Sequence, residues 1–384
     1  MKLNEVTRHI TTPIQCMLWG KAAGRCEFAG CNKPLWKSSV TQEQVNIAQK
    51  AHIYSFSDDG PRGNKEILPQ NVNDLGNLML VCHECHVKID MKKDGGRYSV
   101  PTLQKWKSEH ETRIDIVTGI SPEKRSHVVL YGANIGDHNS PLTFADTATA
   151  LFPAHYPASD KPIELGMKNS SFKDRSPAFW SVETDHLITT FKQRVGERLA
   201  SGEVSHLSIF GLAPQPLLIL LGSLITDIPK AEIFQLHREP QSWAWPENAP
   251  VVDYLVEEPT SATGAPALVL ALSATITNDR ITAVLGNNVA IWKVMIPEPH
   301  NDFLKSPRQL SSFRALLRKL LDKIKLCHGQ NTVLHIFPAI PVSVAAEFGR
   351  IRMPKADMPW TIYDQVNDRG GFVAALNIPE GDRK

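Results

Sequence analysis

The chain has 384 residues, of which 42% are hydrophobic and 21% charged, so its composition is that of a globular protein and excludes wholesale disorder. Lys and Arg total 42 and Asp and Glu total 40, which leaves a net charge of +2 and singles out no class of partner. No run approaches about 18 uninterrupted apolar residues, so the sequence predicts no membrane-spanning helix.

At about 150 residues per domain, this length predicts two or three domains. The first residues contain no apolar signal core and the cysteine usage fits a reducing compartment, so we expect a cytoplasmic protein. Residues 1–125 hold 18 basic and 14 acidic side chains, a net of +4, whereas the remainder holds 24 and 26, a net of −2. The N-terminal part is therefore the better candidate for contact with a polyanion.

Four of the six cysteines form two short pairs in the N-terminal part. Cys26 and Cys31 are separated by four residues, and Cys82 and Cys85 by two. Two such knuckles are the usual source of the four thiolates that hold a tetrahedral zinc ion, and a closed four-sulfur site is structural because it leaves no open position. The alternative is four unliganded thiols in a core. The other two cysteines have no partner pattern and are expected to be ordinary buried thiols.

A histidine, an asparagine and a second histidine accompany the two cysteine pairs. His52 follows an apparent short strand at 45–47. Asn77 opens the apolar run before the second pair, and His86 follows that pair directly and begins a segment, 87–90, that is expected to be helical. An isolated histidine is more often a core residue than a functional one, so the three assignments depend on their occurrence together.

Three motifs in this region, A-H-I at 51–53, G-N-L-M-L-V-C at 76–82 and C-x2-C-H-x3-D at 82–90, resemble those of the HNH or ββα-metal nucleases. The resemblance is to the subgroup with a four-cysteine zinc site and covers roughly residues 20–110. It implies a zinc-containing, treble-clef-like α+β domain that hydrolyses phosphodiester bonds in double-stranded DNA.

The resemblance also implies catalytic roles. His52 would be the general base, because a neutral imidazole with a pKa near 6.5 suits that role at cellular pH. His86 would bind a catalytic divalent metal, Mg²⁺ or another, distinct from the zinc. Asn77 would fix the loop and orient His52 by a hydrogen bond.

One position departs from the family pattern. Many family members have an acidic metal ligand just before the first histidine, whereas this chain has Ala51. The second protein ligand of the catalytic metal is therefore open, with Asp90 and Asp74 as candidates.

Basic side chains near these motifs are candidates for contacts with the DNA backbone. Arg62 lies in a turn that contains glycine and proline, and a guanidinium matches the geometry of a phosphate. A basic cluster follows His86 and consists of Lys88, Lys92, Lys93 and Arg97. The alternative is that this cluster is only a solvated face.

The composition changes near residue 120, and the polar segment 121–126 is the expected linker between a first domain, 1–120, and a second, 127–384. Beyond it, apolar runs alternate with helical patterns, which predicts βαβ units and a largely parallel sheet. The expected strands are 128–131, 206–210, 232–236, 267–272, 289–296, 332–337, 361–366 and 372–378, and the expected helices are 182–199, 216–226, 279–285, 307–326 and 342–348.

The second domain contains an internal repeat. The segment 209–232 has Ile-Phe, a proline four residues later, an apolar helix with a glycine, and Pro-Lys-Ala, and the segment 336–357 repeats this order. Coincidence between two βα units is one interpretation, and a duplicated α/β lobe is the other. In a duplicated lobe the two Pro-containing loops would lie beyond the carboxyl ends of strands, where such sheets bind ligands, and would form a pseudo-twofold cleft.

Four stretches of this domain, 130–133, 179–180, 209–216 and 233–245, resemble the SAVED domain, a cyclic-oligonucleotide sensor of bacterial CBASS antiphage systems. An HNH domain followed by a SAVED domain is similar to the nuclease effectors of such systems. The family is described as two fused CARF-like, Rossmann-like α/β lobes, which agrees with the repeat. The resemblance implies an activating cyclic di- or oligonucleotide made by a partner nucleotidyltransferase.

A cyclic nucleotide needs aromatic faces for its bases, donors for its phosphates and polar groups for its base edges. The candidates are Phe210, Trp243, Trp245 and Tyr363 as aromatic platforms, Lys168 and Arg238 as phosphate contacts, Ser273 and Thr275 as donors near a helix start, and Leu212 in the loop after a strand. The alternative for each is a core or loop anchor.

Together these features predict a cyclic-nucleotide-activated, metal-dependent endonuclease that degrades double-stranded DNA with little sequence preference as an antiphage effector. We expect activation through a homo-oligomer, a dimer or a higher state, because a lone module of about 100 residues buries little DNA. Two alternatives stay open: a restriction endonuclease whose C-terminal domain reads DNA sequence or modification, and a zinc-containing binding protein without catalysis. The net charge of −2 beyond residue 125 is unfavourable for a DNA reader.

Overall fold

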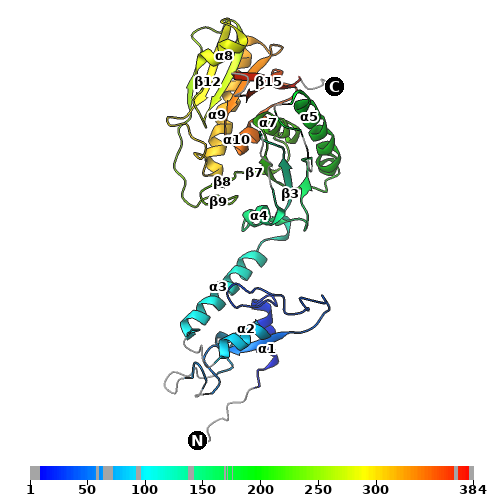
Figure 1. Ribbon diagram of the computed structural model, residues 1–384, viewed down its shortest axis with the longest axis vertical. Helices are drawn as coiled ribbons and strands as arrows, with labels where there is room; N and C mark the ends of the chain where they lie inside the picture. The colour runs from blue at the N-terminus through cyan, green and yellow to red at the C-terminus, as the bar shows by residue number, and fades with distance from the viewer. Residues whose placement is uncertain are drawn as a thin grey trace. The chain divides into compact units, whose positions relative to one another are not determined.

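The computed structural model describes residues 9–57, 60–63, 72–91, 97–136, 142–167, 170, 172–174, 176–366 and 371–379. The chain forms two compact units, of which the first ends at Ser121 and the second begins at Pro122 (Figure 1). Three of the expected binding residues, Lys92, Lys93 and Lys168, lie outside the described residues. Among the helices that the structure describes, none combines the length and the apolar character needed to cross a membrane.

The first unit is built around two antiparallel strands and the helix that follows them. β1 (Ala48–His52) pairs with β2 (Leu78–Cys82), and β2 passes directly into α2 (His83–Asp90). All five residues of β2 are buried, as expected for a run that is apolar on both faces. The strand expected at 45–47 begins three residues later, so that His52 is its last residue.

The remaining helices of the first unit are α1 (Thr12–Lys21), the 3₁₀ turn η1 (Leu75–Asn77) and α3 (Val100–Thr118). The sequence pattern does not predict α3. The helix buries Lys107 and His110 as well as Leu103, and these two polar residues interrupt the apolar stripe that would mark a helix. Lys107 is only 6% exposed and forms an ion pair with Glu111, one turn further along α3. This pairing compensates the buried charge.

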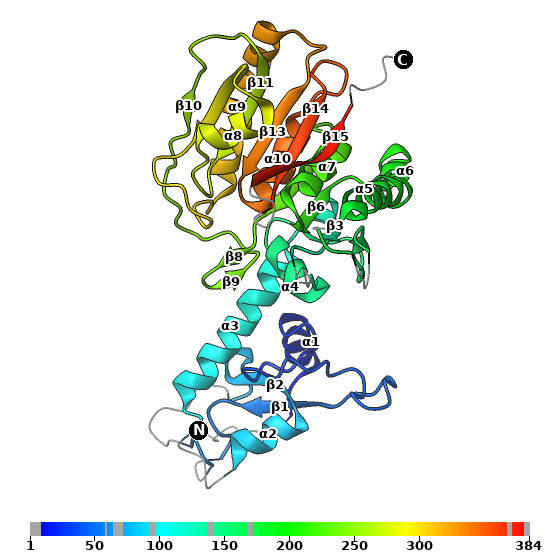
Figure 2. The same ribbon diagram turned by 45° about the horizontal axis from the view of Figure 1, so that its top comes forward.

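The second unit contains two largely parallel sheets, one in each lobe (Figure 2). The sheet of the first lobe has the order β4 (Tyr156–Pro157), β3 (Arg125–Gly132), β6 (Leu207–Leu212) and β7 (Ala231–Phe234), and β5 (Ile163–Glu164) also pairs with β3. The sheet of the second lobe has the order β10 (Leu255–Glu257), β12 (Val289–Met295), β11 (Ala265–Ala271), β13 (Leu334–Ala339), β14 (Trp360–Val366) and β15 (Gly371–Ile378). The edge strands β10 and β15 are antiparallel to their neighbours, and the other pairings are parallel.

Helices connect the strands of both sheets. They are η3 (Pro122–Lys124), α4 (Phe144–Ala148), η4 (Thr149–Leu151), α5 (Pro177–Phe191), the π-helical segment η5 (Lys192–Gly196), α6 (Glu197–Ala200), α7 (Gln215–Ile225), α8 (Asn278–Leu285), α9 (Pro307–His328) and α10 (Val342–Ile351). A short ribbon of β8 (His237–Arg238) and β9 (Gln241–Ser242) follows β7. The expected α/β alternation is confirmed, and the ends of the elements shift by up to five residues. β3 begins at Arg125, so the last two residues of the expected linker belong to a strand.

The two halves of the sequence repeat form equivalent structures. In each lobe one phenylalanine of a central strand stacks on an aromatic ring of the next strand and meets a third ring edge-on. The first lobe pairs Phe210 with Phe234 at 4.5 Å and with Trp243 at 5.1 Å, and the second pairs Phe337 with Tyr363 at 4.4 Å and with Phe372 at 5.1 Å. The matching geometry favours a duplicated lobe over coincidence.

The repeated glycines lie where the helices of the two lobes touch. α7 and α10 pack side by side in the second unit (Figure 2). A Cβ on Gly222 would lie 1.9 Å from the carbonyl oxygen of Ala346, and a Cβ on Gly349 would lie 1.9 Å from that of Ile219. The contact is therefore reciprocal and involves backbone atoms on both sides, which only glycine permits at these two positions.

We expect Gly349→Ala to destabilise the second unit by about 1–3 kcal/mol, because the new methyl group would force α10 away from α7. Helix propensity alone would predict that the substitution raises stability, since alanine is about 1 kcal/mol more favourable than glycine within a helix. Thermal unfolding of the full chain, with hydrogen exchange of peptides from both helices, measures the effect.

Gly196→Ala is the matched control, because its new Cβ would have no neighbour closer than 3.8 Å. It should leave stability unchanged or raise it. Equal stability of Gly349→Ala and the wild-type protein would contradict the close contact between the two helices.

Candidate functional site

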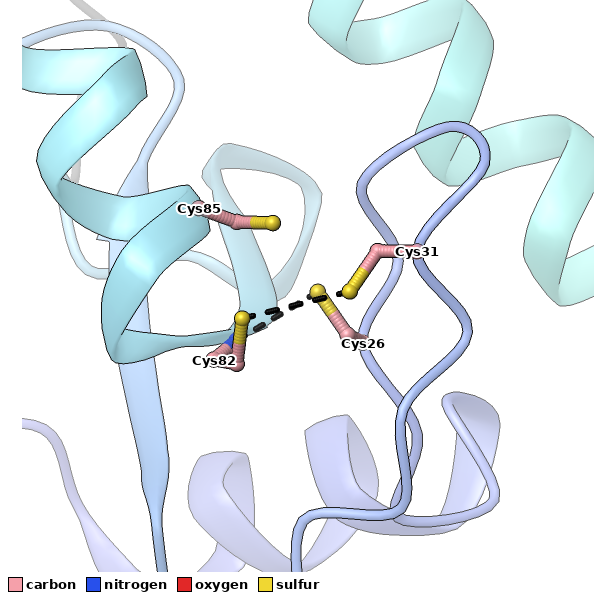
Figure 3. A group of neighbouring side chains, drawn as sticks. All are labelled: Cys26, Cys31, Cys82 and Cys85. Carbon is pink, nitrogen blue, oxygen red and sulfur yellow. Dashed lines mark hydrogen bonds between the residues drawn. The ribbon is translucent and has the colours of Figure 1, made fainter. Parts of the chain in front are cut away.

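The four paired cysteines converge in the first unit. Cys26 and Cys31 lie on the loop after α1, Cys82 is the last residue of β2, and Cys85 is in the first turn of α2. Their side chains point toward one another (Figure 3), and the four sulfur atoms lie within 4.8 Å of each other. The hairpin of the first pair is closed at Gly30, whose φ of +79° is a conformation that favours glycine.

This arrangement fits a tetrahedral metal site. Zinc–sulfur bonds of about 2.3 Å place the sulfurs of a tetrahedral site about 3.8 Å apart, and the Cys31 and Cys82 sulfurs are 3.9 Å apart. Burial raises the pKa of the Cys26 thiol to about 12, so its thiolate needs a nearby cation at neutral pH. Cys16 and Cys327 are exposed, so the expectation that they are buried is wrong.

His52 and Asn77 lie together at the end of β1. The Asn77 side chain accepts a hydrogen bond from the Tyr54 amide at 2.7 Å and donates to the carbonyl oxygens of Tyr54 and Val72 at 3.2 and 2.8 Å. Asn77 therefore fixes the loop after His52, as expected. The hydrogen-bond partner of the imidazole is a different residue, Asn73, whose Oδ1 lies 3.0 Å from His52 Nε2 and accepts the bond. Asn73 lies outside the three motifs of this region, so the sequence did not single it out.

His86 lies on α2, one turn before Asp90. Its Nε2 atom is 3.6 Å from Asp90 Oδ2, and the two side chains are 31% and 45% exposed. Asp74, the other candidate for a metal ligand, is exposed and precedes η1. The helix therefore presents an imidazole and a carboxylate together to solvent.

Arg62 does not occupy a DNA-facing position, so its expected role as a phosphate contact is wrong. Its side chain is only 3% exposed. The guanidinium donates to the backbone oxygens of His52, Ile53 and Ile89 at 3.1, 2.7 and 2.6 Å, and to Asp90 Oδ1 at 2.9 Å. All of these acceptors belong to its own unit, and the burial of the side chain keeps the guanidinium from solvent.

Two of the other basic candidates lie on the surface of the first unit. Lys88 pairs with Glu84 at 3.0 Å, one turn back along α2, and remains about half exposed. Arg97 is exposed and its guanidinium carbon lies 5.9 Å from the ring centre of Tyr98. Both side chains remain accessible to a polyanion, and their role in DNA binding stays a prediction.

The second unit has a cavity of about 550 Å³ between its two lobes. Most of the residues that line it follow the carboxyl ends of β3, β6 and β7 in the first lobe and of β11 and β13 in the second, and the end of β14 adds two more. The other two are Asp174, before α5, and Asn301, after β12. Both repeated prolines, Pro214 and Pro341, are among them. The cavity thus lies where ligands bind in open α/β sheets, as the repeat predicts.

Three expected ligand residues, Leu212, Arg238 and Ser273, line this cavity. Trp243 lines a neighbouring cavity of about 480 Å³ that shares Leu236 and Gln241 with the first. Thr275 and Trp245 line neither cavity.

Phe210 and Tyr363 are wrong as base-stacking platforms. Phe210 is fully buried between Phe234 and Trp243. Tyr363 is 6% exposed, stacks on Phe337, and its hydroxyl lies 2.9 Å from His335 Nδ1. Each ring therefore has its faces occupied within the core of its own lobe.

Two glutamine side chains tie the loops of the two lobes together at the cavity. Gln215 Oε1 accepts from the Ile340 amide at 3.2 Å. Gln235 Oε1 accepts from the amide and the hydroxyl of Ser343 at 3.3 and 2.7 Å. The cavity wall is therefore held by contacts across the lobe boundary.

The cavity also contains charged and polar groups that the sequence did not single out. Burial, together with the charge of Asp174, raises the pKa of Asp364 to about 7. His237 is 3% exposed, and neither of its ring nitrogens has a hydrogen-bond partner among the described residues. The one available signal was position, because His237 directly follows an expected strand and Asp364 lies within another.

Comparison with known proteins gives one family match. The SAVED family model, described as "SMODS-associated and fused to various effectors sensor domain", matches residues 187–378, half of the chain. No curated protein matches this chain.

Solved structures of Cap4 SAVED/CARF-domain containing receptors align with this chain at low identity. The Acinetobacter baumannii receptor with the cyclic trinucleotide 2'3'3'-cAAA aligns with a TM-score of 0.43 and 12% identity, over 77% of this chain and 64% of that one. The Moraxella osloensis receptor aligns with a TM-score of 0.40 and 11% identity, over 75% and 60%. This chain therefore spans less than two thirds of the length of those receptors.

We expect the purified full chain to contain one zinc ion, and Cys82→Ser to lose it. The loss should unfold the first unit, because structural zinc contributes on the order of 10 kcal/mol in small modules. Elemental analysis by mass spectrometry, with thermal unfolding of the same samples, is the measurement. Cys16→Ser, at an exposed cysteine outside the cluster, should keep the zinc, and zinc retained by Cys82→Ser would contradict the site.

Proposed function

The chain belongs to the SAVED family of sensor domains, and from this membership, together with the His52 and His86 groups of the first unit, we propose that it is a cyclic-nucleotide-activated effector nuclease of antiviral defence. The main support for a sensor function is the cavity at the ends of the strands. Residues from both lobes of the second unit line this cavity. Its volume of about 550 Å³ is within the usual range for sites that bind small molecules.

The chemistry of the cavity supports an anionic ligand. α7 begins at Gln215 and α10 at Val342, so the amino ends of two helices meet the cavity, where their dipoles favour negative charge. Arg238 adds a guanidinium, which suits a phosphodiester. Asp364 and Asp174 are unsuited to phosphates and suit the amino groups of bases. These groups together match a ring of linked nucleotides.

The nuclease half rests on His52, Asn73 and Asn77 at the end of β1 and on His86 and Asp90 on α2, which the buried Arg62 connects through the His52 carbonyl oxygen and Asp90 Oδ1. Because Asn73 Oδ1 accepts a hydrogen bond, the proton of the neutral His52 imidazole lies on Nε2. Nδ1 then carries the lone pair that can take a proton from the attacking water. A divalent cation at His86 would stabilise the charge that develops on the scissile phosphate.

The proposed substrate is double-stranded DNA, and Lys88 and Arg97 are the described surface cations that we assign to its backbone. A unit of this size contacts few phosphates, so its affinity for DNA alone would be low. We therefore propose that the cyclic nucleotide promotes a homo-oligomer, which brings two or more nuclease units onto one duplex and raises their effective concentration.

We expect the full chain with Mg²⁺ to degrade plasmid DNA only in the presence of one member of a panel of cyclic di- and trinucleotides. His52→Ala should lower the cleavage rate by about 10²–10⁴-fold, because it removes the general base. Agarose gels over a time course measure the rate.

His83→Ala is the matched control, because His83 is exposed on the same helix as His86 and carries no proposed role. It should cleave like the wild-type protein. Wild-type rates in His52→Ala would overturn the assignment of the base, and site-dependent cutting without any cyclic nucleotide would favour a restriction enzyme.

We expect Arg238→Gln to weaken binding of the activating nucleotide by about 10- to 100-fold, because a hydrogen bond to a charged group contributes about 1.5–3 kcal/mol. Calorimetric titration of the full chain is the measurement. Arg308→Gln, at an exposed arginine that does not line the cavity, should bind normally. Unchanged affinity in Arg238→Gln would place the phosphates elsewhere.

A further inference from the structure

A divalent cation beside His86 needs more than one protein ligand to be held firmly, and residue 51 does not supply one. Ala51 is 1% exposed and has no donor atom in its side chain. We propose that Asp90, positioned by the buried Arg62, forms with His86 the protein half of the catalytic cation site. This inference rests on the proposed nuclease function.

The geometry of α2 brings the two ligand atoms together. His86 and Asp90 are four residues apart and so lie on the same face of the helix. His86 Nε2 and Asp90 Oδ2 are 3.6 Å apart. Neighbouring ligands of an octahedral ion with bonds of about 2.1 Å are about 3.0 Å apart, so a small rotation of either exposed side chain would let both atoms bind one ion.

The exposure of the pair suits a catalytic ion. The two side chains are 31% and 45% exposed, which leaves room for the waters and phosphate oxygens that such an ion keeps in its shell. Among the residues that the structure describes, Asp90 is the one carboxylate within 4.0 Å of a His86 ring nitrogen. Asp74 is exposed and makes no such contact.

Arg62 determines which oxygen of Asp90 is free. It donates to Oδ1 at 2.9 Å, which leaves Oδ2 for the ion. The same guanidinium binds the carbonyl oxygen of His52 at 3.1 Å and that of Ile89 at 2.6 Å. One buried group therefore fixes both the strand end that carries the base and the helix end that carries the metal ligands. Arg62 is thus a positioning residue, and such supporting contacts matter for metal affinity.

The test is Mn²⁺ binding to the full, zinc-loaded chain, followed by the electron paramagnetic resonance signal of free Mn²⁺. Asp90→Asn and His86→Ala should each raise the Kd for Mn²⁺ at least tenfold, and Arg62→Lys should raise it about tenfold. Zinc content should stay at the wild-type value in all three variants. Asp74→Asn and His83→Ala are the matched controls and should bind Mn²⁺ normally.

A purely structural role of Arg62 would lower the thermal stability of Arg62→Lys but leave its Mn²⁺ affinity unchanged well below the unfolding temperature. Unchanged Mn²⁺ affinity in Asp90→Asn would overturn the proposed ligand pair, and so would a wild-type chain that does not bind Mn²⁺. If the wild-type protein cleaves DNA and Asp90→Asn binds Mn²⁺ normally, the nuclease function is supported and Asp90 is not a ligand of the cation. If Mn²⁺ binding depends on Asp90 but the wild-type protein does not cleave DNA, the cation site is supported and the proposed nuclease function is wrong.

Discussion

The backbone contact between α7 and α10 is the constraint on which the second unit depends. Gly222 and Gly349 let each helix approach the carbonyl oxygens of the other, and a methyl group at either position would collide with backbone. A second connection comes from Arg350 of α10, which donates to the carbonyl oxygen of Thr226 at 3.1 Å. Both helices begin at the cavity, because their first residues, Gln215 and Val342, line it. A ligand that bound one spacing of the lobes better than another would shift the packing of the whole unit.

Buried polar groups connect the elements of the first unit in addition to its apolar core. The cysteine cluster joins the loop after α1 to the start of α2, and Arg62 joins the end of β1 to the end of α2. Glu27, beside Cys26, is 1% exposed and accepts a hydrogen bond from the Leu80 amide at 2.5 Å. A small unit buries a smaller fraction of its surface than a large one, so these polar contacts add to the apolar core in fixing the positions of His52 and His86.

The elements of the second unit were largely predictable, whereas parts of the first unit and of both sites were not. Strands and helices with regular apolar periods, such as β12 and α9, appear near their expected positions because the period is a local property. The pattern fails for α3, whose buried face contains Lys107. It also gave Arg62 a surface role, because a basic residue in a polar turn is usually exposed, and burial became possible only through acceptors on β1 and α2.

The sequence by itself determined the two cysteine pairs that form the cluster, because residue type and spacing along the chain define them. It also predicted the His52, Asn77 and His86 set and left a duplicated lobe open beside coincidence. Only the tertiary structure decided which side chains face a cavity. It buried Phe210 and Tyr363 in aromatic clusters and placed Asp364 and Asp174 at the cavity wall. The physical reason is that burial depends on how segments far apart in the chain pack against one another, and no local pattern records that packing.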